Sequence, residues 1–211
     1  MDVMPNYLTK KTQLFFLIAI LVLSIIIRFA SLGENPSGLT NDEADIGYDA
    51  YSLLMTGKDQ WGVSFPISSF KGFGDYRPSL YTYLVVPSIA LFGLNEFAVR
   101  FPSALFGVLT VLITFLLTRK IFNEKIALIA AFLLTISPWH IGMSRVGIES
   151  NIAVFLVIFA TYLFFLTLNN PKLIVFTVLV TILCLYTYYS MRIFIPIIGS
   201  TAFLLYKDKF H

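Results

Sequence analysis

Charged residues are scarce in this chain, and their scarcity excludes an ordinary soluble domain. Lys, Arg, Asp and Glu make up 13% of the 211 residues, whereas 57% are hydrophobic and 21 are phenylalanine. Soluble domains carry about 25% charged residues, and a chain this apolar would expose large sticky surfaces in water. The composition therefore predicts a membrane protein.

Signals of several other protein classes are also missing. The one cysteine, Cys184, lies in an apolar run, so no intrachain disulfide can form. The sequence has no glycine-rich phosphate loop, no CxxC pair and no HExxH zinc motif. Its basic residues are scattered rather than clustered, which argues against nucleic acid as a partner.

Apolar runs are abundant, although a spanning helix needs roughly 20 mostly apolar residues and several runs are shorter than that. The first run could be a secretory signal, but so much membrane-type sequence follows it that we expect a retained anchor. The candidate helices are residues 13–32, 79–94, 98–118, 126–141, 152–168, 173–188 and 193–206.

Basic residues orient these segments, because short cytoplasmic loops are enriched in Lys and Arg. We place the residues before the first run on the cytoplasmic side. The basic residues between later runs then also lie on the cytoplasmic side, provided that segment 79–94 makes no net crossing of the membrane. Pro87 within that segment and Tyr81 near its start favour an interfacial or re-entrant helix; a seventh crossing is the alternative. The inside residues are then Lys10, Lys11, Arg119, Lys120, Lys125, Lys172, Lys207 and Lys209.

This topology predicts one all-α module over residues 1–211, a polytopic transmembrane helical bundle with about six spans. Residues 33–97 form its first extracytoplasmic loop, which carries juxtamembrane or re-entrant helices. Within that loop, residues 42–56 are expected to form an amphipathic helix on the membrane surface, capped by Gly57. Its expected apolar face comprises Ala44, Ile46, Ala50, Leu53 and Leu54.

The outer segments bring carboxylates and guanidinium groups to one membrane face. Carboxylates at a water–lipid boundary are costly unless they bind a cation, a polar substrate or a basic partner. A carboxylate can deprotonate a hydroxyl, and arginines can hold a phosphate through paired hydrogen bonds. The candidate residues are Asp42, Glu43, Asp75, Tyr76 and Arg77; then His140, Arg145 and Glu149; and finally Tyr186, Tyr188, Tyr189 and Arg192.

Each of these residues also has a plain structural interpretation. Asp42 and Glu43 could cap a surface helix, and the arginines could bind lipid headgroups or pair with nearby acids. His140 could be an interfacial hydrogen-bonding group, and the tyrosines could form an aromatic belt. Arg28 is expected to extend towards the interface from the first helix.

The chain resembles the GT-C superfamily of membrane glycosyltransferases, specifically the protein O-mannosyltransferase and aminoarabinose-transferase group. The resemblance runs nearly end to end. It rests on Asn41-Asp42-Glu43-Ala44 with Tyr48, and on residues 73–81, 91–104, 137–149 and 186–192.

The resemblance implies transfer of a sugar, with inversion, from a polyprenyl-phosphate donor to an acceptor outside the cytoplasm. It implies that Asp42 is the base, that Glu43 belongs to the same motif, that Arg77 contacts phosphate and that Glu149 is a second acid. A divalent Mg or Mn ion is a possible cofactor, with oxygen ligands from Asp42, Glu43, Asp75 and Glu149.

Members of this group are usually about twice as long, so we expect an N-terminal catalytic half whose partner is a missing C-terminal half. The alternative is a non-catalytic membrane subunit that binds the lipid carrier or serves as a scaffold. A transporter is less favoured, because the spans contain few ionisable residues for an ion path.

Overall fold

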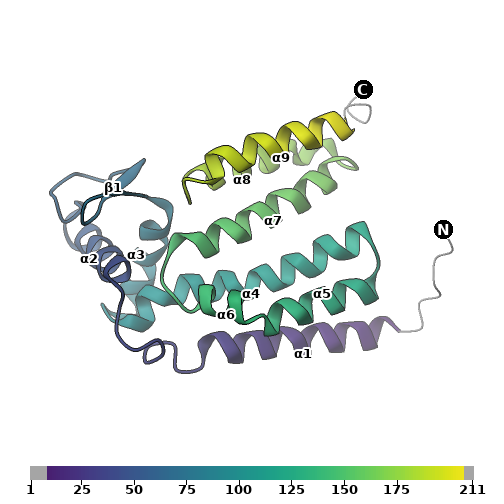
Figure 1. Ribbon diagram of the computed structural model, residues 1–211, viewed down its shortest axis with the longest axis horizontal. Helices are drawn as coiled ribbons and strands as arrows, with labels where there is room; N and C mark the ends of the chain where they lie inside the picture. The colour runs from purple at the N-terminus through teal and green to yellow at the C-terminus, as the bar shows by residue number, and fades with distance from the viewer. Residues whose placement is uncertain (1–8, 207–211) are drawn as a thin grey trace.

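The computed structural model describes residues 9–206 and shows the expected all-α helical bundle (Figure 1). Six helices run along one common direction. They are α1 (Lys10–Phe29), α4 (Glu96–Ile121), α5 (Glu124–Ile136), α7 (Glu149–Thr167), α8 (Ile174–Leu185) and α9 (Met191–Tyr206). Lys207 and Lys209, which were expected on the inside, lie outside the described residues.

The helices that were expected to span the membrane differ in length. α1, α4 and α7 are each long and apolar enough to cross a membrane. A fourth candidate is the pair formed by α5 and α6 (Pro138–Ser144), which is bent by 62°. α8, with the 3₁₀ turn η1 (Pro171–Leu173) before it, and α9 are shorter apolar helices.

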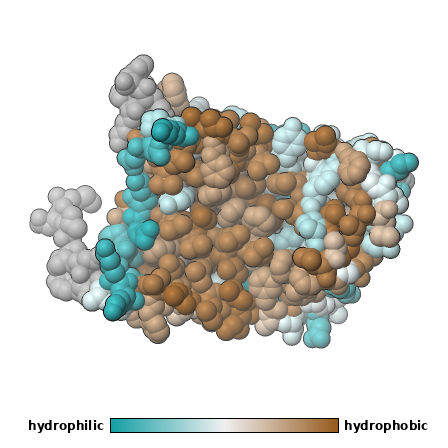
Figure 2. Space-filling view, turned by 180° about the vertical axis from the view of Figure 1, so that it is seen from behind, coloured by the Kyte–Doolittle hydropathy of each residue, from teal (hydrophilic) through white to brown (hydrophobic). Residues whose placement is uncertain are grey.

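Many large apolar side chains of these helices are exposed on the flank of the bundle. Figure 2 shows them on one face, with hydrophilic side chains gathered at the two ends. Such a distribution suits a bundle whose flank contacts lipid and whose ends contact water.

The helix expected over residues 126–141 is instead broken at Ser137. α5 ends at Ile136, and α6 starts at Pro138. A proline at the first position of a helix is tolerated because it needs no N–H there, but it cannot continue a preceding helix. The break leaves α6 against α4 at Gly107, where an added Cβ would lie 2.4 Å from the Cβ of Ser144.

A group of smaller elements lies beyond the end of the bundle where α1 ends (Figure 1). It comprises α2 (Asn41–Thr56), the antiparallel strands β1 (Ser69–Lys71) and β2 (Tyr76–Pro78), and α3 (Leu80–Phe92). The β1–β2 hairpin was not predicted. The 13 residues of α3 span about 20 Å at 1.5 Å per residue, which is short for a membrane crossing.

The expected helix α2 forms, but its buried face is more polar than predicted. Thr40 and Glu43 make a reciprocal capping box at its start, and Gly57 ends it in the left-handed conformation with φ 71°. Ala44 and Leu54, expected on the apolar face, are exposed. The buried face of α2 instead includes three carboxylates, those of Glu43, Asp45 and Asp49.

Candidate active site at the outer end of the bundle

Three acidic side chains from separate segments meet at the end of the bundle that carries α2. Asp42 is exposed in the first turn of α2, and Asp75 is exposed in the turn between β1 and β2. Glu149, the half-buried first residue of α7, lies close enough to both for their charges to act on it, and Arg77 acts on it as well. Asp42, Asp75, Arg77 and Glu149 thus lie on elements at the same end of the bundle.

The neighbouring carboxylate, that of Glu43, is fully buried rather than open to a substrate. Its Oε1 accepts hydrogen bonds of 2.8 Å from Arg100 Nε and from the backbone N–H of Gly147. Its Oε2 accepts a bond of 2.9 Å from the backbone N–H of Thr40. Burial alone would raise the pKa of Glu43, but these donors outweigh burial and lower it. Glu43 therefore ties α2 to α4 and to the segment before α7.

Arg100 completes this connection and was missed as a site residue by the sequence analysis. Its side chain is fully buried, and it donates to the carbonyl oxygens of Leu32 at 3.1 Å, Pro36 at 2.7 Å and Gly38. The loop between α1 and α2 is thereby fastened to α4. A charged residue close to the start of an apolar helix is rare and often functional. This feature of the sequence could have identified Arg100.

Arg77 is buried between two carboxylates of α2. Its Nη1 lies 2.6 Å from Asp45 Oδ2, and its Nη2 lies 2.5 Å from Asp49 Oδ2. Burial raises the pKa of Asp49, against the opposing effects of a hydrogen bond from the Gln60 N–H and the charge of Arg77. In this arrangement the charge of Arg77 is already compensated, and its main effect is to hold the hairpin against α2.

Arg145 also binds protein groups, although it was expected to contact phosphate. Its guanidinium donates to the carbonyl oxygens of Ile27 and Ala30 at 2.8 Å and of Asn35 at 2.7 Å. These bonds satisfy carbonyls that the end of α1 leaves without helical partners. Arg145 therefore caps α1 and positions the loop that leads to Asp42.

Arg28, near the end of α1, binds carbonyl groups at the end of α5 and also contacts His140. Arg28 is fully buried, so the prediction that it extends to the interface was wrong. Its Nη1 donates to Thr135 O at 3.3 Å, its Nη2 donates to Leu134 O at 3.3 Å, and Nη2 lies 2.7 Å from Nδ1 of buried His140. Arg28 thus caps the C-terminal end of α5, and His140 holds the Arg28 guanidinium in place.

The third outer segment, between α8 and α9, closes onto the hairpin. The Tyr189 hydroxyl donates to the carbonyl oxygen of Tyr76 at 2.8 Å. The guanidinium carbon of exposed Arg192 lies 4.8 Å from the centre of the Tyr189 ring, a cation–π contact. Tyr186 and Tyr188 are exposed beside them. Within residues 9–206, no carboxylate lies within ion-pair distance of Arg192, and its side chain is exposed to solvent.

A metal site is not evident from side-chain geometry. Among residues 9–206, no three His, Cys, Asp or Glu side chains are placed to hold a metal ion together. The charges of Asp42 and Asp75 act on Glu149, but these three carboxylates do not form a ligand set. We therefore assign no chemical step to a metal.

This geometry combines two exposed carboxylates, those of Asp42 and Asp75, with the half-buried Glu149 and the exposed guanidinium of Arg192. An exposed carboxylate can accept a proton from a hydroxyl nucleophile. A guanidinium can stabilise the negative charge that gathers on a departing phosphate. The arrangement suits transfer of a group from a phosphate to a hydroxyl acceptor.

Known proteins with related sequences include membrane glycosyltransferases. A sequence model of the family described as dolichyl-phosphate-mannose-protein mannosyltransferase matches residues 76–210, which is more than half of the chain. A Bacillus subtilis (strain 168) protein, described as "Putative mannosyltransferase YkcB", is 28% identical over 157 residues, which cover 72% of this chain and 22% of the relative. An uncharacterised protein of Aquifex aeolicus (strain VF5) is 29% identical over 72% of this chain and 30% of its own length.

A solved structure has a similar fold. The crystal structure of the Archaeoglobus fulgidus oligosaccharyltransferase, tethered with an acceptor peptide, aligns with a TM-score of 0.70 at 19% identity. The alignment covers 91% of this chain and 26% of that protein. The chain thus spans less than a third of the length of each of these proteins, and at this identity the structural likeness concerns the fold alone.

Proposed function

Since the chain belongs to the dolichyl-phosphate-mannose-protein mannosyltransferase family, we propose that it carries the active site of an inverting glycosyltransferase. The donor is a sugar on a polyprenyl phosphate, and the acceptor is a hydroxyl-bearing molecule outside the cytoplasm. The observation that supports this most is the meeting of Asp42, Asp75 and Glu149 at one end of the bundle, with Arg192 exposed at the same end.

The proposed reaction is a single displacement. Asp42 takes the proton of the acceptor hydroxyl while the hydroxyl oxygen forms a bond to the anomeric carbon of the sugar. The bond from that carbon to the phosphate oxygen breaks, and the phosphate leaves with the electron pair. Attack from the side opposite to the leaving group inverts the configuration at the anomeric carbon.

We assign the phosphate to Arg192 rather than to Arg77 or Arg145. Arg77 lies in ion pairs with Asp45 and Asp49, and Arg145 is occupied by backbone carbonyls. Arg192 is exposed, and its guanidinium lies against the ring of Tyr189, so its donors can bind an incoming phosphate. Arg77 and Arg145 then act as positioning residues for the loops that carry Asp75 and Asp42.

The base is tested by transfer of radiolabelled sugar from a polyprenyl-phosphate donor in membranes that contain the protein. Asp42→Asn is expected to lower the rate by at least about 100-fold, because general-base catalysis contributes roughly 10²–10⁴-fold. The matched control is Glu34→Gln, which neutralises another exposed acid of the same outer loop and should leave transfer unchanged.

The same assay separates the enzyme from the non-catalytic alternative. A scaffold or carrier-binding subunit would bind the lipid phosphate with or without Asp42 and would show no turnover. Equal transfer by the wild-type protein and Asp42→Asn would remove Asp42 from its proposed role.

A further inference from the structure

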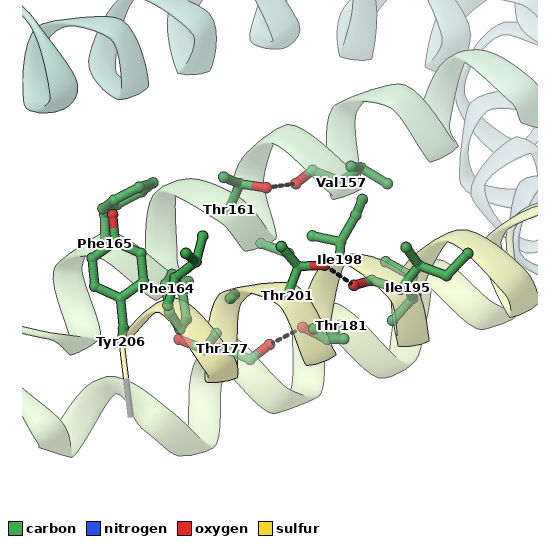
Figure 3. A pocket seen from close by; sticks show the side chains of 15 residues that line it. Val157, Thr161, Phe164, Phe165, Thr177, Thr181, Ile195, Ile198, Thr201 and Tyr206 are labelled. Carbon is green, nitrogen blue, oxygen red and sulfur yellow. Dashed lines mark hydrogen bonds between the residues drawn. The ribbon is translucent and has the colours of Figure 1, made fainter. Parts of the chain in front are cut away.

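A groove in the apolar flank of the bundle lies between α7, α8 and α9. Its volume is about 400 Å³, and Figure 3 shows the side chains that line it. One side of it is formed by α9, of which no residue is buried. Small residues create the space: a Cβ at Gly199 would meet nothing within 4 Å. Its lining includes Ala160, Phe164, Thr181, Ile198, Gly199 and Ala202.

The threonine hydroxyls that line the groove are bonded to their own helices. The hydroxyls of Thr161, Thr181 and Thr201 donate to the carbonyl oxygens four residues earlier, at 2.8, 2.7 and 2.8 Å (Figure 3). Thr177 does the same at 3.0 Å. A hydroxyl whose proton is already donated offers little to a polar ligand. The groove therefore suits a hydrocarbon chain.

Aromatic rings lie at one end of the groove, and the guanidinium of Arg192 lies beyond the other end. Tyr206 packs edge-on against Phe164, with ring centroids 5.6 Å apart. At the opposite end, Ile195 lines the groove and lies three residues after Arg192, a distance of about 4.5 Å along a helix. α9 thus leads from an exposed guanidinium directly into an apolar channel about 15 Å long, from Ile195 to Leu205.

We propose that this groove binds the isoprenoid tail of the polyprenyl-phosphate donor, with its phosphate at Arg192. The inference rests on the proposed function, because that function supplies an anionic lipid. Charge complementarity at Arg192 selects the phosphate end, and the apolar lining selects the chain that follows it. Because bulk lipid is as apolar as the groove, the tail would be held there by van der Waals packing against the lining and by the phosphate contact at Arg192 rather than by removal from water.

The test uses a polyprenyl phosphate with a photoreactive diazirine in its first isoprene units. The protein is reconstituted in phospholipid nanodiscs, irradiated and mapped by peptide mass spectrometry. Labelling is expected on α7, α8 and α9. Ala202→Phe, which fills the groove, should lower it by at least about tenfold and should raise the KM for the donor while kcat stays unchanged.

The matched control is Ala19→Phe, which fills a different apolar groove between α1 and α5 and should change neither labelling nor KM. Asp42→Asn should keep full labelling while it loses transfer, so a failure of the groove and a failure of the proposed base give different results. Labelling that Ala202→Phe leaves unchanged would overturn the assignment. So would labelling that an excess of ordinary phospholipid abolishes, or cross-links from the groove to another polypeptide helix.

Discussion

The Oε1 atom of Glu43 lies 2.8 Å from the Nε atom of Arg100, and neither side chain is exposed to solvent. The two residues are 57 positions apart and belong to different helices. Their pairing aligns the first turn of α2, which carries Asp42, with α4. Through the Gly147 N–H, the same carboxylate also fixes the segment that leads to Glu149.

Removal of one partner of this pair is expected to be costly. Glu43→Ala leaves the Arg100 guanidinium buried without a carboxylate, and breaking a buried ion pair costs about 3–5 kcal/mol. The measurement is the free energy of unfolding of the purified protein in a mild detergent. Sugar transfer should fall as well, because Asp42 and Glu149 lose their common support.

A surface ion pair provides the control. Arg119 and Glu124 are 3.8 Å apart, and 47% and 25% of their side-chain surfaces are exposed. Because exposed pairs contribute about 0–1 kcal/mol, Glu124→Ala should change the free energy of unfolding by no more than that. Similar losses in the two variants would show that the Glu43–Arg100 pair has no special structural weight.

The lowered pKa of Glu43 predicts a pH dependence of stability. Because the folded protein favours the ionised carboxylate, its stabilising effect is complete above the ordinary glutamate pKa of 4.5. It declines as the pH falls through the lower pKa of the folded state. Melting temperatures measured between pH 7 and pH 3 should therefore drop at the acid end, and Glu43→Gln should make this drop shallower.

Asp49 should affect the pH dependence of stability in the opposite direction to Glu43, so the two residues can be compared within one protein. Burial raises its pKa in the folded protein, so its ionisation favours the unfolded chain. Stability from this group is present below the ordinary aspartate pKa of 3.8 and is lost as the pH rises through the folded value. Asp49→Asn should therefore steepen the acid drop that Glu43→Gln makes shallower. Equal slopes in both variants would contradict these pKa directions.

Local rules predicted much of the fold because the apolar runs are long and their caps are explicit. The all-α bundle, the helix over residues 42–56 and its end at Gly57 followed from hydrophobic runs and capping residues. The break at Ser137 was missed because the apolar run continues across it, although Pro138 was visible in the sequence.

The site was only partly predictable, because partners depend on which chain segments meet. The sequence placed Asp42, Asp75, Arg77 and Glu149 on one face, and the structure brings them together. It could not show that Arg77 and Arg145 are already bound to protein groups, since those partners are 28 and more than 100 residues away. Long-range partners of this kind leave no local periodicity to detect.

The arginines of the outer end are expected to separate into two classes. Arg145→Ala removes several hydrogen bonds to carbonyls at the end of α1, so it should lower the free energy of unfolding by about 2–4 kcal/mol. Arg192→Ala removes an exposed side chain, so it should leave stability within about 0.5 kcal/mol and raise the KM for the donor. Unfolding curves and initial rates on the same preparations would test both. If Arg145→Ala raised the KM for the donor without loss of stability, the phosphate contact would have to be assigned to Arg145 instead of Arg192.

The hydrogen bond from Tyr189 to the Tyr76 carbonyl predicts a coupling between the third outer segment and the hairpin. Tyr189→Phe removes this bond of 2.8 Å and should cost about 1 kcal/mol. It should also speed hydrogen exchange of the backbone amides in β2. Tyr188→Phe alters a neighbouring exposed tyrosine and is expected to do neither; equal effects of the two variants would show that the bond does not hold the hairpin.

The placement of the acid cluster outside the cytoplasm is itself a prediction, based on the distribution of basic residues. Cys184 is buried, and Cys184→Ala provides a background for single cysteines. Glu34 and Lys120 are both exposed but lie at opposite ends of the bundle. In intact cells a membrane-impermeant maleimide should label a cysteine at position 34, whereas a cysteine at position 120 should react only after the membrane is opened. Labelling of position 120 but not of position 34 in intact cells would place the acidic end of α2 in the cytoplasm and would leave Asp42 without an extracytoplasmic acceptor.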